Sequence, residues 1–117
     1  MVSAIRADGR DIRIALRPAY VHRASSGWVQ DLDLLIGEAT VSGVPRSLPI
    51  EISEGSLTLG GAVWPNMFPI VSTPAVPVVL DLLLISGESV AIHGRGLDVQ
   101  VRGEARYVEP LPTHQRV

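Results

Sequence analysis

Three histidines, His22, His93 and His114, are the side chains of this sequence best suited to acid–base chemistry. Nucleophilic catalysis also needs a nucleophile within hydrogen-bond reach of the base, and usually a third group that orients the base. The sequence has no cysteine and no Gly-x-Ser-x-Gly elbow. We therefore expect the protein not to be an enzyme, and keep an enzyme with an unrecognised site around His22 or His93 as an alternative.

Metal-binding patterns are equally sparse. No two histidines stand at the spacing of a strand or helix metal site, and there is no thiolate. Asp31 and Asp33 share one face of an expected strand and could contribute to a calcium site, but a solvated strand face explains them more simply. We predict no metal and no cofactor.

Glycine pairs at Gly60–Gly61 and Gly94–Gly96 resemble phosphate-binding loops only superficially. Both lack the Lys-Ser/Thr of a P-loop and a following helix. The sequence Gly94-Arg95-Gly96 predicts a hairpin turn in which glycine supplies a positive φ. An anion site carried by Arg95 is the less favoured interpretation.

The segment 60–69 differs from the rest of the chain, because it concentrates aromatic and rigid residues. Two of only five aromatic residues, Trp64 and Phe68, lie in it together with Met67, and Pro65 and Pro69 stiffen it. Asn66, the only asparagine, suits a turn. Such a loop either folds back to plug one end of the protein or contacts another molecule. We take Trp64, Asn66, Met67 and Phe68 as the candidate interaction loop.

The composition is that of one folded domain. Valine, isoleucine and leucine together make up 37 of the 117 residues, enough for a hydrophobic core. We predict a single domain over residues 1–117, with flexible ends at 1–10 and 110–117. The absence of cysteine excludes disulfide bonds.

Charge and hydropathy exclude further classes of function. Ten arginines face twelve carboxylates, so the net charge is −2, and the arginines are spread among the acids. This pattern argues against nucleic-acid binding. The lack of lysine suggests a GC-rich bacterial genome. The sequence shows no secretion signal, and its most apolar window, 76–85, is half the length of a membrane span. We expect a cytoplasmic protein that does not bind membranes.

Alternating apolar and polar residues predict β-strands. Ile12, Ile14 and Leu16 alternate with arginines, and similar alternation runs through residues 50–53, 57–59, 90–93 and 97–102. Gly and Pro punctuate these runs every 8–12 residues. We predict an all-β fold, a single-domain β-sandwich of about 7–9 antiparallel strands with a Greek-key-like crossover; a small closed β-barrel is the alternative.

Two runs carry additional information. Residues 28–39 fit helical spacing, but the alternation of Leu32, Leu34 and Ile36 favours a long strand, bulged near Gly37. Residues 78–85 are apolar on both faces except at Asp81, which is typical of a central strand or of a strand covered by another chain.

A possible internal repeat links the two halves of the chain. Leu32-Asp33-Leu34-Leu35 recurs 48 residues later as Leu80-Asp81-Leu82-Leu83. The repeat indicates two related halves of about three strands each. Amphipathic strands of similar composition also resemble one another by chance, and both interpretations stay open.

These patterns favour a non-catalytic protein-interaction module. We expect it to self-associate, as a homodimer or larger homo-oligomer, or to bind an unidentified protein partner. Outward arginines at 13, 102 and 106 would protect strand edges or pair with carboxylates of a partner strand. The first alternative is a carrier of a small apolar or amphipathic ligand.

Overall fold

The computed structural model describes residues 1–23, 26–43, 45–65, 68–69 and 72–110, of which 18, 20–23, 26–27, 68–69 and 104–110 are described by their backbone alone. The described chain contains nine strands and no helix. The strands are β1 (Val2–Asp8), β2 (Asp11–Arg23), β3 (Ser26–Ile36), β4 (Thr40–Ser42), β5 (Ile52–Leu59), β6 (Ala62–Pro65), β7 (Phe68–Pro69), β8 (Ser72–Leu84) and β9 (Ser89–Pro110).

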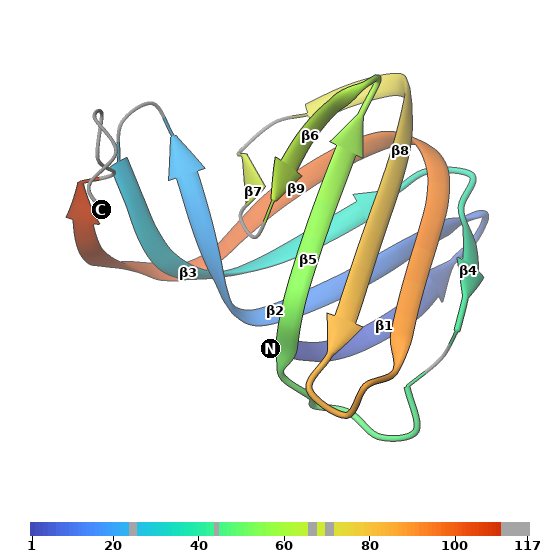
Figure 1. The fold of residues 1–117 in the computed structure, drawn as a ribbon. Coiled ribbons are helices and arrows are strands. Elements are labelled where there is room, and N and C mark those ends of the chain that lie inside the picture. Colours follow the sequence, from blue (N-terminus) through green and yellow to red (C-terminus); the bar gives the residue numbers. More distant parts are fainter. Residues whose placement is uncertain (24–25, 44, 66–67, 70–71, 111–117) are drawn as a thin grey trace.

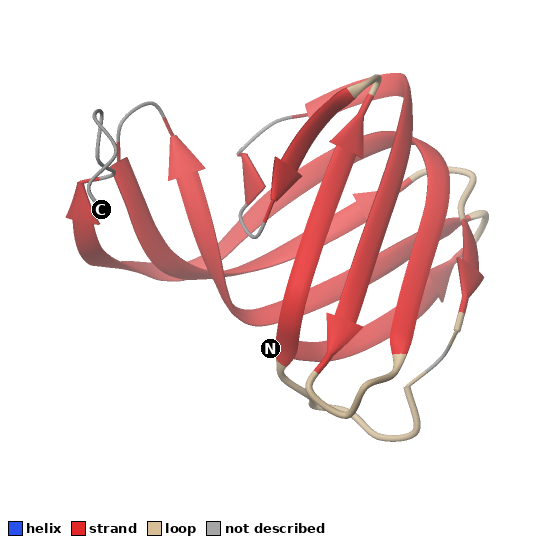
Figure 2. Cartoon of the chain, in the orientation of Figure 1, coloured by secondary structure: helices blue, strands red, loops and turns tan. Residues whose placement is uncertain are grey.

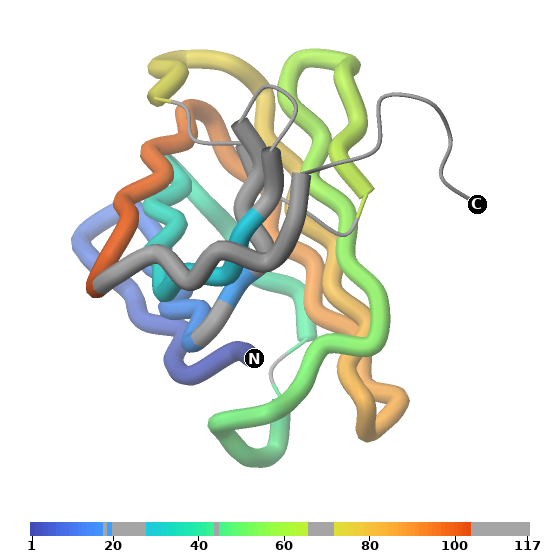
Figure 3. The backbone as a smooth tube through the Cα atoms, turned by 90° about the vertical axis from the view of Figure 1, so that its left-hand side faces the viewer, coloured from blue at the N-terminus to red at the C-terminus, as the bar shows by residue number. Residues whose placement is uncertain are grey.

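All nine strands belong to one sheet that folds over itself into two layers. The order is β1-β2-β3-β9-β8-β5-β6, with β4 paired to β9 and β7 paired in parallel to β2. Strands β1, β2 and β3 form one layer and β5, β6 and β8 the other, while β9 takes part in both (Figures 1 and 2). The view from the side separates the layers (Figure 3). The all-β sandwich is confirmed, and the sheet does not close into a barrel.

The first ten residues do not form the flexible end expected from the sequence. Residues 2–8 pair with β2, and Val2 is fully buried. Val2 also exchanges two backbone hydrogen bonds with Ile50, of 2.8 and 2.9 Å. Burial of one apolar side chain and pairing on both sides hold this end in place. The other end, 111–117, lies outside the described residues.

Strand β9 turns from one layer to the other at a corner formed by three glycines. Ile36 pairs with Leu97, and Thr40 pairs with His93 in the same register. Strands β3 and β4 therefore pair with successive stretches of β9, and an irregularity at Gly37 separates them. At that irregularity Gly37 donates to Gly96 and accepts from Arg95. The long strand predicted over residues 28–41, bulged near Gly37, is therefore close to the observed pair of strands Ser26–Ile36 and Thr40–Ser42. The predicted hairpin at Gly94–Gly96 is wrong, because these residues lie inside β9.

Glycine is required at this corner because the two backbones touch. A side chain at Gly94 would overlap the carbonyl oxygen of Gly37 and approach Cγ2 of Ile36 to 2.6 Å. A side chain at Gly37 would meet the carbonyl oxygen of Arg95 at 2.5 Å. Gly96 has φ +87°, a left-handed conformation that glycine adopts without strain. The sequence pattern that looks locally like a turn is thus a bend in a continuous strand.

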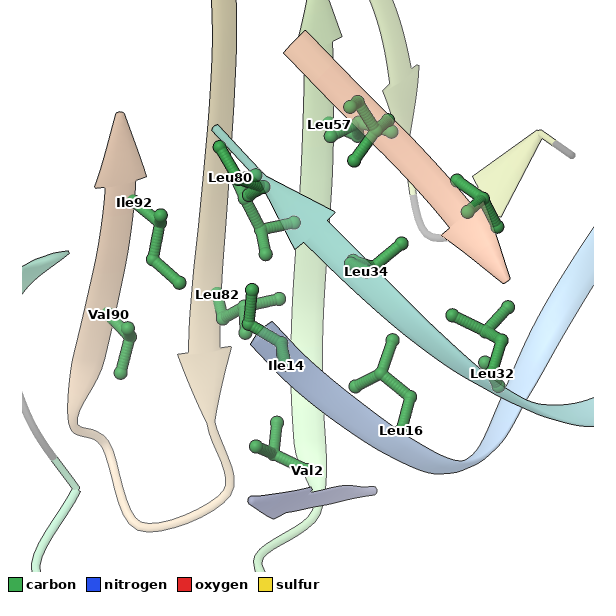
Figure 4. Packing of buried hydrophobic residues seen from close by; sticks show 14 of the residues in the cluster. Val2, Ile14, Leu16, Leu32, Leu34, Leu57, Leu80, Leu82, Val90 and Ile92 are labelled. Atoms are coloured by element: carbon green, nitrogen blue, oxygen red, sulfur yellow. The ribbon is translucent and has the colours of Figure 1, made fainter. Parts of the chain in front are cut away.

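The core lies between the layers and is aliphatic. Ile14, Leu34, Leu57, Leu80 and Ile92 come from five different strands, and each is fully buried (Figure 4). Burial of such side chains is worth about 1.5–3 kcal/mol each. Strand β8 is central in its layer, between β5 and β9, as one interpretation of its two apolar faces predicted.

Beyond the sandwich, β2, β3 and β9 continue as a three-stranded arm (Figure 1). Register shifts interrupt the ladder between Leu16 and Ala19 and between Val29 and Asp31. Bulges of this kind bend strands and increase their twist. They mark the place where the arm leaves the body.

The two copies of the Leu-Asp-Leu-Leu motif lie on β3 and β8, the strands on either side of β9. In each copy the first two leucines are buried: Leu32 and Leu34 in one, Leu80 and Leu82 in the other. The motifs occupy equivalent places in the two layers.

We expect Gly94→Ala to lower the free energy of unfolding by about 2 kcal/mol or more, because the added methyl group forces two backbones apart. In a domain of this size that corresponds to a fall in Tm of about 8 °C. Thermal unfolding followed by circular dichroism measures it. The control, Ser89→Thr, adds a methyl group to the outer face of the same strand. Equal stability of the two variants would contradict the close contact at the corner.

Candidate functional site

Of the candidate interaction loop, Trp64 lies on a hairpin strand. Residues 62–65 form β6 and pair with β5, placing Trp64 opposite Leu57. Trp64 is half-buried and packs against the core. The backbone of Phe68 and Pro69 pairs with the arm at Val21 and His22, while Asn66 and Met67 lie outside the described residues. Trp64 therefore contributes to the packed interior, and contact of Trp64, Asn66, Met67 and Phe68 with another molecule stays a prediction.

The structure gathers no histidine-based site in the part of the chain that it describes. His93 is exposed on the outer face of β9, opposite Val79 and Thr40. His22 belongs to the backbone of the arm, and His114 lies outside the described residues. No three His, Asp or Glu side chains among the described residues come close enough to hold a metal ion.

An ionic cluster that the sequence did not predict lies on the outer face of β2, β3 and β9. Asp33 is only 6% exposed. Its carboxylate accepts hydrogen bonds from three arginines, and we call these four residues the Asp33 cluster. The distances to its Oδ atoms are 2.8 Å from Arg17 Nη2, 3.2 Å from Arg102 Nε and 3.3 Å from Arg13 Nη1. Gln100 Oε1 accepts from Arg13 and Arg102 and extends the network. The three strands are thereby joined across their outer face.

The cluster shifts the acid–base equilibrium of Asp33. Its burial alone would raise the pKa, but hydrogen bonds and charge from Arg17 and Arg102 outweigh this effect and lower the pKa below the ordinary value. Asp33 therefore stays ionised in the folded protein and acts as a structural anion. It is not the solvated carboxylate expected from the sequence.

Sequence reasoning missed this cluster because its members come from three strands. Arg13 and Arg17 lie on the same face of β2, and the register places Asp33 opposite Ala15, between them. The fourth member, Arg102, is distant in sequence and reaches Asp33 only because β9 pairs with β3. Arg13 and Arg102, two of the three outward arginines, thus pair with a carboxylate of the same chain; the side chain of Arg106 lies outside the described residues.

The outer face of the other layer carries an open groove of about 560 Å³. Residues from β4, β9, β8, β5 and β6 line it; we call this side of the protein the groove face. Asp81 lies in it with Ser56 and Ala91 directly opposite on the neighbouring strands, and Glu54 and Leu83 lie beside it. Asp81 and Glu54 are exposed, and within the described chain their side chains form no hydrogen bond or ion pair.

Apolar side chains are also exposed on the groove face. Leu83 is 38% exposed, because alternate residues of β8 point away from the core. Ile85, in the turn that follows β8, is 64% exposed. Val63 on β6 is 60% exposed. An exposed leucine on the solvent side of a central strand is what the second interpretation of residues 78–85 expects, namely a strand that another chain covers.

No family model, no curated protein and no solved structure matches this chain. The described residues include no apolar helix of membrane-spanning length. The features that bear on function are those of the two outer faces and of the packed interior. The ligand-carrier alternative predicts an internal cavity that opens near Trp64 or Trp28, and it stays a prediction; both side chains are partly buried against the core.

Replacement of Asp33 tests the cluster. We expect Asp33→Asn to lower the free energy of unfolding by about 1–3 kcal/mol, because three guanidinium groups lose their shared anion. The cost stays below that of a fully buried pair since the arginine side chains are 30–50% exposed. Chemical denaturation measures it, with Asp31→Asn as the control on the same face of β3. Equal stability of both variants would contradict a structural role for Asp33.

The same variant predicts a pH dependence. Because the pKa of Asp33 is lowered on folding, its contribution is complete above the unfolded value of about 3.9 and is lost as pH falls through the folded value. The difference in unfolding free energy between wild type and Asp33→Asn should therefore shrink between about pH 5 and pH 2. Denaturation curves at several pH values measure this difference. A difference independent of pH would show that the carboxylate charge is not what stabilises the cluster.

Proposed function

We propose that this protein is a non-catalytic interaction module that self-associates through its groove face. The observation that carries the proposal is the outer side of β8, the central strand of its layer, where Leu83 is exposed and is followed by exposed Ile85 in the turn after the strand. Covering these side chains removes apolar surface from water and favours association.

The charges of the groove face favour a second copy as the partner. The carboxylates of Asp81 and Glu54 lie near the N-terminal end of β9, which is Ser89. This follows from the register, because Glu54 and Ser89 both pair with Leu83. Arg95 lies farther along β9, opposite Pro77. Two copies packed face to face with their strands antiparallel bring Arg95 of each near the carboxylates of the other. A twofold interface requires this kind of self-complementary surface.

Within the segment 60–69, the described residue that borders this surface is Pro65. Pro65 lines the groove, whereas its neighbour Trp64 packs against the core. We propose that Trp64 anchors the edge of the interface, so that β6 presents Pro65 and Val63 to the partner. Asn66, Met67 and Phe68 remain candidates for additional contacts.

Charge reversal tests the proposal. We expect wild-type protein to sediment as a dimer at micromolar concentration, and Asp81→Arg and Arg95→Glu each to shift it toward monomer by like-charge repulsion. The double variant Asp81→Arg with Arg95→Glu should recover the dimer, because the complementary charges return with exchanged sign. Sedimentation velocity over a concentration series measures all four proteins.

Leu83→Glu and Val101→Glu form a matched pair for the apolar contact. Both residues are about equally exposed, at 38% and 42%, but Val101 pairs with Leu32 in the other layer. Leu83→Glu should abolish the dimer and Val101→Glu should retain it. A monomeric wild type, or loss of the dimer in both variants, would contradict the groove face as the interface.

A further inference from the structure

We propose that a hollow on the opposite outer face, over Ala4 and Ala15, binds a phosphate group. The hollow has a volume of about 200 Å³. Its floor is made by the two alanines, which lie directly opposite each other on β1 and β2. Arg6, Arg13 and Arg17 border it, and we call it the arginine hollow.

Positive charge around the arginine hollow exceeds the negative charge available to it. Arg6 and Arg13 lie directly opposite each other across β1 and β2, an arrangement of like charges that destabilises a sheet. Asp33 also borders the hollow, but Arg102 shares its Oδ2 atom with Arg13. Asp8 reaches only Arg13, at 3.7 Å, and is 60% exposed. An anion between the arginines would relieve the remaining repulsion.

Arg6 is the arginine that is most available to a ligand. It is exposed, and within the described chain its side chain forms no hydrogen bond or ion pair. Arg13 and Arg17, by contrast, are held in place by Asp33. The Asp33 cluster therefore fixes two guanidinium groups at the edge of the hollow before any ligand arrives, which reduces the entropy lost on binding.

The arrangement favours a phosphate group over a carboxylate. A planar carboxylate matches one guanidinium fork. A tetrahedral phosphate presents oxygens in several directions and can accept from three arginines that approach from different sides. The hydroxyl of Ser3, which also borders the hollow, adds a further donor.

Titration with inorganic phosphate tests the proposal. Amide resonances of the ¹⁵N-labelled protein are followed at constant ionic strength, with sodium chloride replacing phosphate. We expect saturable shifts centred on Ala4 and Ala15. Arg6→Gln should weaken binding about tenfold or more, as expected when a hydrogen bond to a charged group is lost. Arg10→Gln, with the same change of charge in the exposed β1–β2 turn, should bind like wild type.

A second variant fills the hollow without changing its charge. Ala4→Leu places a larger side chain on its floor and should abolish binding while the thermal stability stays near that of wild type. Glycerol phosphate distinguishes the source of the group: binding as tight as that of inorganic phosphate assigns the site to phosphomonoesters, and its absence assigns it to the free ion. Non-saturable shifts, unchanged binding by Arg6→Gln, or tighter binding of citrate than of phosphate would overturn the proposal.

Discussion

The close contact between the backbones of Gly37 and Gly94 is the constraint on which the rest of this structure depends. It allows β9 to bend where a side chain would collide with a carbonyl oxygen, so that one strand pairs with β3 in one layer and with β8 in the other. Both halves of the core are thereby attached to the same strand. The outer faces of the layers, which carry all the features of functional interest, take their positions from this bend.

The same short motif lies on both outer faces, but its carboxylate has a different environment on each. In Leu32-Asp33-Leu34 the leucines are buried and the carboxylate is enclosed by three arginines. In Leu80-Asp81-Leu82 the leucines are again buried, but the carboxylate is exposed in an open groove. The first face is closed by ionic bonds within the chain and leaves an excess of arginine at its edge. The second face leaves carboxylates and apolar side chains exposed. This difference between equivalent positions is why we propose association for one face and anion binding for the other.

The sequence predicted the features that depend on local pattern and missed those that depend on distant contacts. Alternation in residues 12–16 and 97–102 indicated strands with one buried face, and the all-β sandwich followed from such runs. The bend at Gly94 was predicted as a turn because its cause, contact with Gly37, involves a residue far away in the chain. Asp33 was predicted to be solvated because neither Arg13 nor Arg102 is near it in sequence. The expectation of a flexible N-terminal end failed for the same reason, since Val2 is held by Ile50.

Native-state hydrogen exchange along β9 tests the central claim most directly. If the glycine bend makes β9 a single continuous strand, the amides of Ile92 and Val99, on either side of it, should exchange with the same free energy of opening, equal to that of global unfolding. The two layers would then unfold as one cooperative unit. A distinctly lower free energy of opening for Ile92 than for Val99, or the reverse, would show that the two halves of β9 open independently. That result would contradict a fold in which one bent strand holds both layers together.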